Sequence, residues 1–532
     1  MKMSNAMLMS CFCFLNISML LFVPINGTPA DESTEPSPST KVEPRTENAI
    51  VFDEENINVL VEDAIDWAHN ILLVMRPPGM EGRSDMVQNV PFSLFPTPFP
   101  RAMFNEAIDV AKAMSLLYFR VSRDIDFLKM VYKDVIDSDL SIRNYLKICE
   151  DVHNEGIKQP ISIYLQRSDY MVHVSESDDG EKKYELKQIE VNGGSIGGAN
   201  GIPPRITKIH ERMLEKAGFP NFPEDVLPRS TKAESASAQM LLTAWKKFKN
   251  PKAIIVSLVV KEKSKWHFCK RFDEYEIDRI TNKKVKVYYL SMEEAVKMLT
   301  LDEDYTLRLE GKPIGVFYIN MILIGVVLGP KYLNMLKMAE RSTAIKSPSL
   351  FFEITISKRV QQVLTKPGMV ERFFPNPEDA PMVTAIRKTF AKMWGLENPD
   401  DEETKRVIQD AIAHPERYVM KPNKEGGGKN FWEQEIVDRL KKFTSKQRAA
   451  YILMERLNPL VAQNYLIWAN EKPIFSDVIT ELGVYTYCVY DTKAGTLVEY
   501  TQPGQMIRTK CASSNEGGIG AGLGVFDSLY LY

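Results

Sequence analysis

The chain has 532 residues, of which 44% are hydrophobic and 26% are charged. These values exclude wholesale disorder, a collagen helix and a coiled coil, and the length fits two to four domains or one large unit with an insertion. The 67 Lys and Arg residues against 70 Asp and Glu residues leave a net charge of -3. The basic excess that is usual for nucleic-acid-binding proteins is absent, so we expect no nucleic-acid partner.

The first 30 residues differ in composition from the rest of the chain. Lys2 precedes an almost wholly apolar stretch over 8–23, and Pro24 and the small residues 27, 28 and 30 follow it. This pattern indicates a secretory signal peptide. A membrane span is the alternative, but it needs about 20 apolar residues. We predict a signal peptide over 1–27, a disordered linker over 28–50 and a secreted mature protein without membrane contact.

Four cysteines remain after the predicted signal peptide, namely Cys149, Cys269, Cys488 and Cys511. Four scattered thiols in a secreted chain permit one or two disulfides but require none, and we expect free thiols. Cys269 lies beside two basic residues and is a candidate activated thiol, although a lone cysteine is more often structural.

In chain order, residues 53–160 show helical spacing, interrupted by a loop rich in Phe and Pro over 91–100. Strand-like segments follow at 161–165 and 184–192. Alternating patterns then predict strands at 253–260, 284–290 and 313–320 with a helix at 291–299, which is typical of a small parallel α/β domain. After residue 350, helices lead to strands at 417–421, 451–455 and 477–490. The predicted fold class is α/β (α+β), with domain boundaries at 51–250, 251–356 and 357–532.

A glycine triplet lies in the segment Lys421-Pro-Asn-Lys-Glu-Gly-Gly-Gly428, between a strand and a segment over 431–442 that is predicted to be helical. Consecutive glycines let backbone N–H groups approach an anion, and Glu425 is a possible Mg²⁺ ligand. The alternative is a flexible hairpin loop. Neither a P-loop nor a dinucleotide-binding fingerprint is present.

Two further segments carry candidate ligand-binding groups. Gln188, Glu190 and Asn192 alternate along a predicted strand and therefore share one face, where a carboxylate and an amide suit Mg²⁺. The alternative is a solvated strand face. Arg508 and Lys510 precede a glycine-rich loop over 515–522, which predicts a lid over an anion or, alternatively, an exposed hairpin.

The order of these motifs resembles eukaryotic glutathione synthetase, over about residues 55–532. The motifs are Arg167-Ser-Asp-Tyr170, Gln188-Ile-Glu190-Val-Asn192, the 421–428 segment, Met454-Glu455, Glu481-Leu-Gly483 and Arg508-Thr-Lys510. The resemblance implies an ATP-grasp fold with a helical N-terminal part and an inserted small parallel α/β substrate-binding domain. The secretion signal looks like that of the secreted glutathione-synthetase-like effectors of plant-parasitic nematodes.

The resemblance implies an ATP-dependent ligase and a homodimer. In the family reaction, ATP phosphorylates the carboxylate of γ-glutamylcysteine and the amine of glycine attacks the acyl phosphate. The implied Mg²⁺ ligands are Glu190, Asn192 and Glu425, and Arg167 and Arg508 are the implied arginines at the acyl centre. The implied ATP contacts are Glu190, Lys358, Lys421, Glu425, Gly426, Gly427, Gly428, Asn430, Trp432, Met454, Glu455, Leu457, Glu481, Lys510 and Glu516.

The implied substrate side departs from the family. Its positions here are Arg167, Ser195, Ser264, Lys270, Asn320, Leu323, Arg508, Ile519 and Gly520. The family has Arg-Asp-Gly-Tyr where this chain has Asn320-Met-Ile-Leu323. Loss of one charge-assisted pair weakens binding roughly 10- to 150-fold. We predict an intact ATP site with an altered or weakened pocket for a γ-glutamyl peptide, or a related carboxylate, and a small amine. The alternative is a secreted nucleotide-binding pseudo-enzyme that binds a host peptide or protein.

Overall fold

The computed structural model describes residues 53–177, 179–194, 201–219, 223, 225–230, 232, 235–260, 272–423 and 430–532. Residues Thr46–Tyr532 form one compact unit. The predicted signal peptide and linker lie outside the described residues. None of the helices in the described ranges combines the length and the apolar composition needed to cross a membrane.

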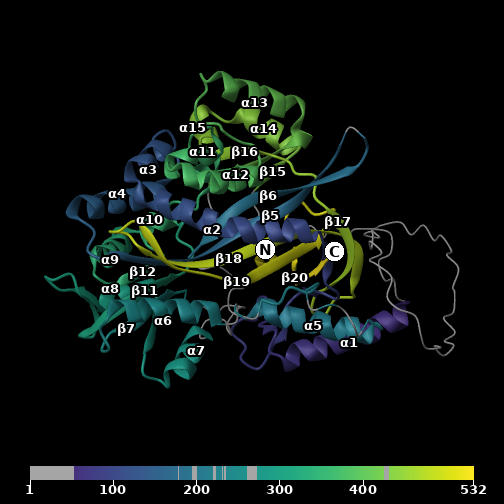
Figure 1. Ribbon diagram of the computed structural model, residues 1–532, viewed down its shortest axis with the longest axis horizontal. Coiled ribbons are helices and arrows are strands. Elements are labelled where there is room, and N and C mark those ends of the chain that lie inside the picture. Colours follow the sequence, from purple (N-terminus) through teal and green to yellow (C-terminus); the bar gives the residue numbers. More distant parts are fainter. Residues whose placement is uncertain are drawn as a thin grey trace, which may run out of the picture. The chain divides into compact units, whose positions relative to one another are not determined.

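A seven-stranded sheet forms the centre of this unit, in the order β17-β3-β20-β19-β18-β5-β6 (Figure 1). All neighbours are antiparallel except β20 and β3, which run parallel. The long strands of this sheet are longer than predicted. For example, β5 was predicted over 161–165 and continues through the Arg167–Tyr170 motif. The strands are β3 (Phe92–Ser93), β5 (Ile161–Glu176), β6 (Lys182–Gly193), β17 (Val461–Ile467), β18 (Ile474–Asp491), β19 (Thr496–Cys511) and β20 (Val525–Asp527).

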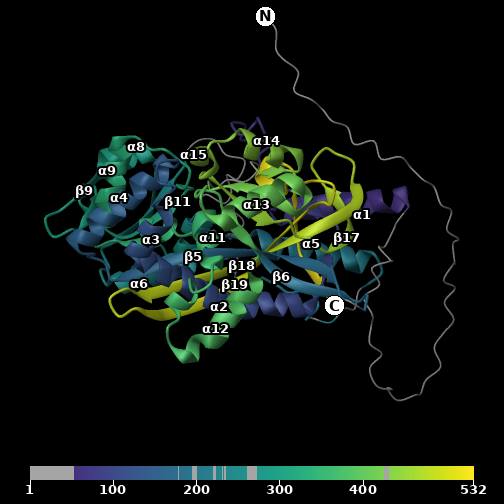
Figure 2. The same cartoon turned by 90° about the horizontal axis from the view of Figure 1, so that it is seen from above.

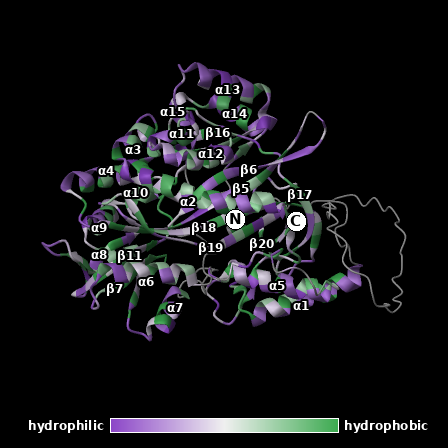
Figure 3. Ribbon diagram, in the orientation of Figure 1, coloured by the Kyte–Doolittle hydropathy of each residue, from purple (hydrophilic) through white to green (hydrophobic). Residues whose placement is uncertain are grey.

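The two faces of this sheet bury two different cores. On β18, Val484 and Tyr490 pack into a core shared with α2 (Arg101–Arg123), whereas Tyr485 and Val489 pack into a core shared with α1 (Glu54–Asn70) and α5 (Ile202–Lys216). Side chains of a strand point alternately to its two faces, so apolar residues at both even and odd positions bury both faces of β18. The outer helices α1 and α5 carry hydrophilic and hydrophobic residues together, as amphipathic covering helices do (Figure 3).

A second sheet confirms the predicted parallel α/β region. Its order is β8-β7-β11-β10-β9, with β12 beside β11, and the pairings of β7 with β8 and of β11 with β7 and β12 are parallel. The boundaries 251–356 stay a prediction. The elements are α6 (Ala236–Phe248), β7 (Ile254–Val259), α7 (Phe272–Thr281), β8 (Val287–Leu290), α8 (Met292–Met298), β9 (Leu299–Leu301), β10 (Leu307–Leu309), β11 (Lys312–Asn320), α9 (Pro330–Arg341) and β12 (Ile345–Ser347).

A third sheet, in the order β13-β16-β14-β15, carries one side of the candidate site. The prediction of a helix from residue 431 is wrong at its start. Phe431 and Trp432 pair with β14 as strand β15, and Glu433 turns the chain with a φ of 47° before α14 begins. The elements are α11 (Lys358–Thr365), α12 (Ala380–Thr389), β13 (Met393–Gly395), α13 (Glu402–Ala413), β14 (Tyr418–Pro422), β15 (Phe431–Trp432), α14 (Gln434–Lys442), α15 (Ser445–Arg448) and β16 (Tyr451–Glu455).

The remaining elements join these sheets (Figure 2). The predicted Phe- and Pro-rich loop over 91–100 contains the short strands β3 and β4, since β4 pairs with the last strand of the chain. Cys149, Cys488 and Cys511 are free thiols, and Cys269 lies outside the described residues. The elements are β1 (Val74–Met75), β2 (Gln88–Asn89), β4 (Thr97–Phe99), α3 (Ile125–Tyr132), α4 (Leu140–Glu155), α10 (Leu350–Glu353), η3 (Glu371–Phe373), η4 (Pro377–Asp379), η5 (Pro415–Arg417), η6 (Ile519–Ala521) and β21 (Leu529–Leu531).

Candidate functional site

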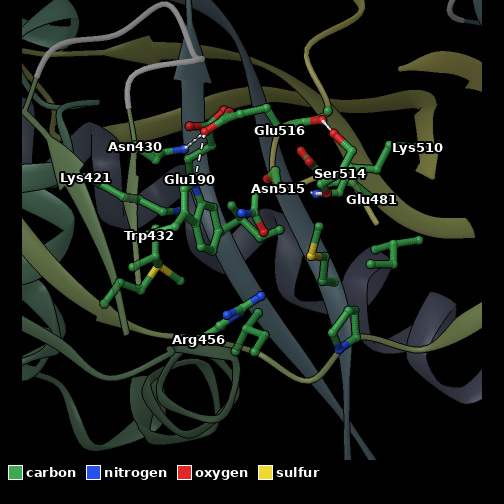
Figure 4. A pocket seen from close by; sticks show the side chains of 18 of the residues that line it. Glu190, Lys421, Asn430, Trp432, Arg456, Glu481, Lys510, Ser514, Asn515 and Glu516 are labelled. Atoms are coloured by element: carbon green, nitrogen blue, oxygen red, sulfur yellow. Dashed lines mark hydrogen bonds between the residues drawn. The ribbon is translucent and has the colours of Figure 1, made fainter. Parts of the chain in front are cut away.

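A cavity of about 640 Å³ lies between the central sheet and the third sheet, beneath the loop that follows β19. Figure 4 shows side chains from these separate elements pointing toward one another. Every predicted ATP-binding residue that the structure describes lines this cavity. They are Glu190, Lys358, Lys421, Asn430, Trp432, Met454, Glu455, Leu457, Glu481, Lys510 and Glu516, joined by Arg508.

Glu190, on β6, is the carboxylate at the cation-rich end of the cavity. Its Oε2 lies 3.1 Å from Nζ of Lys358, the first residue of α11. Burial opposes the charge of Glu190, yet Lys358, Arg508 and Lys421 together hold the pKa of its carboxyl well below the ordinary value. Glu190 therefore stays ionised and available to a cation over the physiological range.

Asn192 lies two residues further along the same strand. Its amide nitrogen donates to Asp169 Oδ2 at 2.9 Å and to Glu190 Oε1 at 3.3 Å. Among the described residues no hydrogen bond uses the amide oxygen. A carboxylate oxygen and an available amide oxygen on neighbouring positions are hard donors that fit Mg²⁺. The predicted third ligand, Glu425, lies outside the described residues.

Asp169 is the centre of a buried charge network that sequence reasoning did not assign. Its carboxylate accepts two hydrogen bonds from Arg167, at 2.6 and 2.7 Å, and one from Arg508 at 2.9 Å. A side chain at residue 483 would meet the Asp169 carboxylate at 2.7 Å, which explains the glycine of the Glu481-Leu-Gly483 motif. The period-2 spacing of residues 167 and 169 within one strand was the available signal.

Arg508 connects this network to the cavity. Its guanidinium is also paired with Glu481, which lies opposite it on the neighbouring strand β18. Burial raises the pKa of Glu481, and Arg508 opposes that rise. Arg508 therefore has a fixed position between two carboxylates, with about one fifth of its side chain exposed to the cavity (21%).

The other end of the cavity suits a planar base. Met454 and Leu457 meet Val419, Ile479 and the Trp432 ring there. The guanidinium carbon of Arg456 lies 5.4 Å from the Trp432 ring centroid, a cation–π contact that sequence reasoning missed (Figure 4). An aromatic face beside apolar side chains is the usual environment of a nucleotide base.

The loop after β19 reaches across the cavity. Lys510 Nζ donates to the carbonyls of Ser514 and Asn515 at 2.6 and 3.0 Å, which fixes the first turn of the loop. Glu516 then accepts hydrogen bonds from Asn430 at 2.9 Å and from the Trp432 indole at 3.4 Å (Figure 4). The loop thus bridges β19 and β15, and its role as a lid stays a prediction.

Of the predicted substrate residues that the structure describes, Arg508 lines this cavity, and the others do not. Arg167 is 5% exposed, and its guanidinium donates to Asp169, which also accepts a hydrogen bond from Arg508. Leu323 is buried, and its N–H donates to Glu353, 3.4 Å away. Asn320 ends strand β11, Ile519 packs into the core with α1 and α5, and Gly520 is exposed. Ser195, Ser264, Lys270, Glu425, Gly426, Gly427 and Gly428 lie outside the described residues.

Comparison with known proteins agrees with this geometry. Residues 54–531 match the family model of the eukaryotic glutathione synthase ATP binding domain. The chain is 31% identical to glutathione synthetase from Xenopus laevis and 31% identical to that from Homo sapiens, each over 485 residues that cover 91% of this chain and 98% of the relative. The chain is also similar to the apo structure of a glutathione synthetase-like effector, GSS30, from Globodera pallida, at 31% sequence identity and a TM-score of 0.72. The match covers 91% of this chain and 99% of that chain. The chain belongs to the eukaryotic glutathione synthetase family.

Proposed function

We propose that this chain is a secreted ATP-dependent carboxylate–amine ligase that acts through an acyl phosphate, on a substrate that differs from γ-glutamylcysteine or is bound more weakly. Family membership supports the ATP-dependent ligase chemistry. The observation that carries the proposal is the cavity itself, whose lining combines the ionised Glu190 and two lysines with the Trp432 ring.

In phosphoryl transfer, some residues of the cavity would bind the nucleotide and others would stabilise the charge of the phosphates. The base would lie against Trp432 and Met454, and the phosphates would extend toward Lys358 and Lys421. Glu190 and Asn192 would hold Mg²⁺, with Glu425 as the proposed third ligand. When bound, Mg²⁺ neutralises phosphate charge and aligns the triphosphate.

Two cations carry the steps that follow. Lys358 exchanges its contact with Glu190 for a phosphate oxygen, so both charges remain paired when nucleotide binds. Arg508 is already oriented by Asp169 and Glu481, and it stabilises the negative charge shared by the substrate carboxylate and the transferring phosphoryl group while the bond to ADP breaks and ADP leaves. The amine then attacks the activated carbonyl and displaces phosphate.

One observation favours a second candidate, a binding module without turnover. The segment after β11, where the family pairs an arginine with a substrate carboxylate, exposes Ile322, Val326 and Val327 by 52%, 41% and 56%. Exposed apolar side chains close together are typical of interaction surfaces. In this alternative, the nucleotide is bound but not consumed, and the apolar segment binds a host peptide or protein.

Phosphate release separates the two candidates. The full chain, with ATP and Mg²⁺, is given a panel of γ-glutamyl dipeptides and related carboxylates, each with glycine and other small amines. Release that requires both a carboxylate and an amine supports the ligase, and the Glu190→Gln variant controls for contaminating ATPases. Nucleotide binding without release for any pair would favour the binding module.

We also propose that the mature protein is a secreted homodimer that begins near residue 28. The composition of residues 1–27 and the family resemblance support these two statements. Expression in a secreting host, followed by mass spectrometry of the N-terminus and light scattering of the purified protein, tests both. A secreted protein that retains residues 1–27, or a scattering mass near the 60.7 kDa of one chain, would contradict them.

A further inference from the structure

A second cavity, of about 500 Å³, lies where α2 ends and α3 begins, and it shares no lining residue with the nucleotide site. Three arginines from two elements line it, Arg120 and Arg123 on the last turn of α2 and Arg372 on η3, together with His153 of α4. We call this cavity the arginine pocket. Figures 1 and 2 show α2, α3 and α4 meeting in this region.

Two of the three guanidinium groups already have partners. Arg372 donates to Asp124 Oδ2 through Nε and Nη2, at 3.0 and 2.6 Å. Arg120 donates to the carbonyl of Phe373 at 2.5 Å and lies 3.4 Å from an Asp379 carboxylate oxygen. The other carboxylate oxygen of Asp124 accepts the Phe127 N–H at the start of α3, so both oxygens of this carboxylate are already hydrogen-bonded.

Arg123 differs from the other two. In the part of the chain that the structure describes, its guanidinium makes no hydrogen bond and no ion pair, and its Cζ lies 5.7 Å from the centroid of the Phe351 ring. Burial lowers the pKa of Arg123, and the carboxylate of Glu340 opposes that shift. A partly buried, permanently charged group with unused N–H donors favours an anion.

The dipole of α2 does not account for this arrangement. Basic residues in the last turn of a helix interact favourably with its C-terminal end. That interaction uses the charge of Arg123 but none of its five N–H donors. An oxyanion with several acceptor oxygens would use both, since planar guanidinium groups match phosphate oxygens in pairs.

We propose that the arginine pocket binds a small phosphoryl-bearing anion, with Arg123 as the principal ligand and Arg120 and Arg372 at its sides. The pocket would be a second ligand site, separate from the nucleotide cavity. Its remaining acidic lining residue, Asp126, has a side chain that is 84% exposed and lies 3.9 Å from Lys129, so it directs little negative charge into the pocket.

The position of the pocket connects it to the nucleotide site through one helix. Asp124 caps the start of α3 inside the pocket. At the other end of α3, the Tyr132 hydroxyl donates to the carbonyl of Ile354, 2.5 Å away, and lies 2.6 Å from Ser357 Oγ. Ser357 is the N-cap of α11, whose first residue is Lys358. An anion that orders the start of α3 therefore acts on a helix that supports a nucleotide-binding lysine.

The test is a titration of the full chain with inorganic phosphate at constant ionic strength, followed by calorimetry and by amide hydrogen exchange. We expect saturable binding and slower exchange over residues 124–132. Arg123→Gln loses one charge-assisted pair, so its dissociation constant for phosphate should be roughly 10- to 150-fold higher than that of the wild type. Glycerol phosphate as a second probe distinguishes an organic phosphomonoester, which would bind more tightly, from phosphate alone.

Two controls locate the site. Arg83→Gln changes an exposed arginine that is paired with Asp85, and it should bind phosphate as the wild type does. Lys358→Met removes a cation of the nucleotide cavity, so phosphate binding that persists in this variant does not come from that cavity. If Arg123→Gln does not fold, Arg123→Lys keeps the charge without the planar guanidinium and should still weaken binding. Wild-type affinity in a folded Arg123 variant, loss of binding in Lys358→Met, or no wild-type binding at all would overturn the proposal.

Discussion

Replacing Lys358 by methionine removes the cation closest to Glu190 while keeping an unbranched side chain of similar length. The two charges are 3.1 Å apart, and their side chains are only 8% and 22% exposed. At an effective dielectric constant of 20, the direct attraction amounts to about 5 kcal/mol before desolvation is subtracted. Breaking a buried pair by removing one partner typically costs about 3–5 kcal/mol. Arg508 and Lys421 still face Glu190, so we expect the lower end of that range.

The same variant should weaken nucleotide binding, because Lys358 is expected to pair with a phosphate oxygen. One charge-assisted contact is worth about 1.5–3 kcal/mol, or roughly a 10- to 150-fold rise in the dissociation constant. The assays are chemical denaturation and calorimetric titration with a non-hydrolysable ATP analogue and Mg²⁺.

The pH dependence of Lys358→Met has a definite sign. The folded-state pKa of Glu190 lies below its unfolded value, so the stability it contributes is present above the unfolded pKa and is lost as the pH falls through the folded one. Without Lys358 the pKa is depressed less. The variant should therefore differ most from wild type at neutral pH, and the difference should shrink as the pH falls below the ordinary glutamate value of about 4.3.

Lys405→Met is the matched control. Lys405 lies 2.7 Å from Glu402, closer than the Lys358–Glu190 pair, but these side chains are 46% and 87% exposed. Exposed pairs contribute about 0–1 kcal/mol, so this variant should be nearly as stable as wild type and should bind nucleotide normally. Equal stability losses in the two variants, together with less than about a threefold change in nucleotide affinity for Lys358→Met, would refute the reasoning.

Three further variants test separate parts of the structure. Burial raises the pKa of Asp273 to about 6, although a hydrogen bond from Ser237 opposes the rise. Because the folded state holds this proton more tightly than the unfolded chain, the free energy of unfolding falls as the pH rises from about 4 to 6. In denaturation curves, Asp273→Asn should therefore be more stable than wild type by at most about 3 kcal/mol at pH 8 and equally stable near pH 4. Asp169→Asn leaves two buried guanidinium groups without their shared charge and should lose about 3–5 kcal/mol, so a loss below about 1 kcal/mol would contradict the network. Trp432→Ala should weaken nucleotide binding by about 1–3 kcal/mol while Trp432→Phe keeps most of the affinity, and equal calorimetric constants for the two would exclude stacking.

The sequence predicts those parts of the fold in which local pattern and burial agree. Residues 254–259 are apolar except for Ser257, and they form a parallel strand buried on both faces. The strand that begins at residue 161 was predicted too short because Arg167, Ser168 and Asp169 are polar. They stay in a buried strand because the arginine and the carboxylate satisfy each other, a pairing that no local propensity reports.

Tertiary pairing also explains the error at Phe431. In the sequence, the aromatic residues 431 and 432 continue the helical pattern of the residues that follow. In the structure, Trp432 pairs with Val419 of β14, and the chain turns at Glu433. Aromatic residues favour strands when a partner strand is available, and the partner is separated from them by the glycine segment.

The candidate site also contains residues that the sequence predicts and residues that it does not. Charged residues that line the cavity, such as Glu190, Lys421 and Lys510, were predicted because their motifs combine charge with strand or loop spacing. Asp169 and Arg456 were missed because they act through other side chains, Arg508 and Trp432, that are distant in sequence. Such contacts depend on strand register and packing, which spacing within one segment does not encode.

The most direct test of the central claim is a crystal structure of the full chain with Mg²⁺ and a non-hydrolysable ATP analogue. The account predicts the base beside Trp432 and Met454, the phosphates at Lys358 and Lys421, and the metal at Glu190 and Asn192, beneath the 512–518 loop. An analogue bound elsewhere, or this cavity empty at saturating analogue, would contradict it.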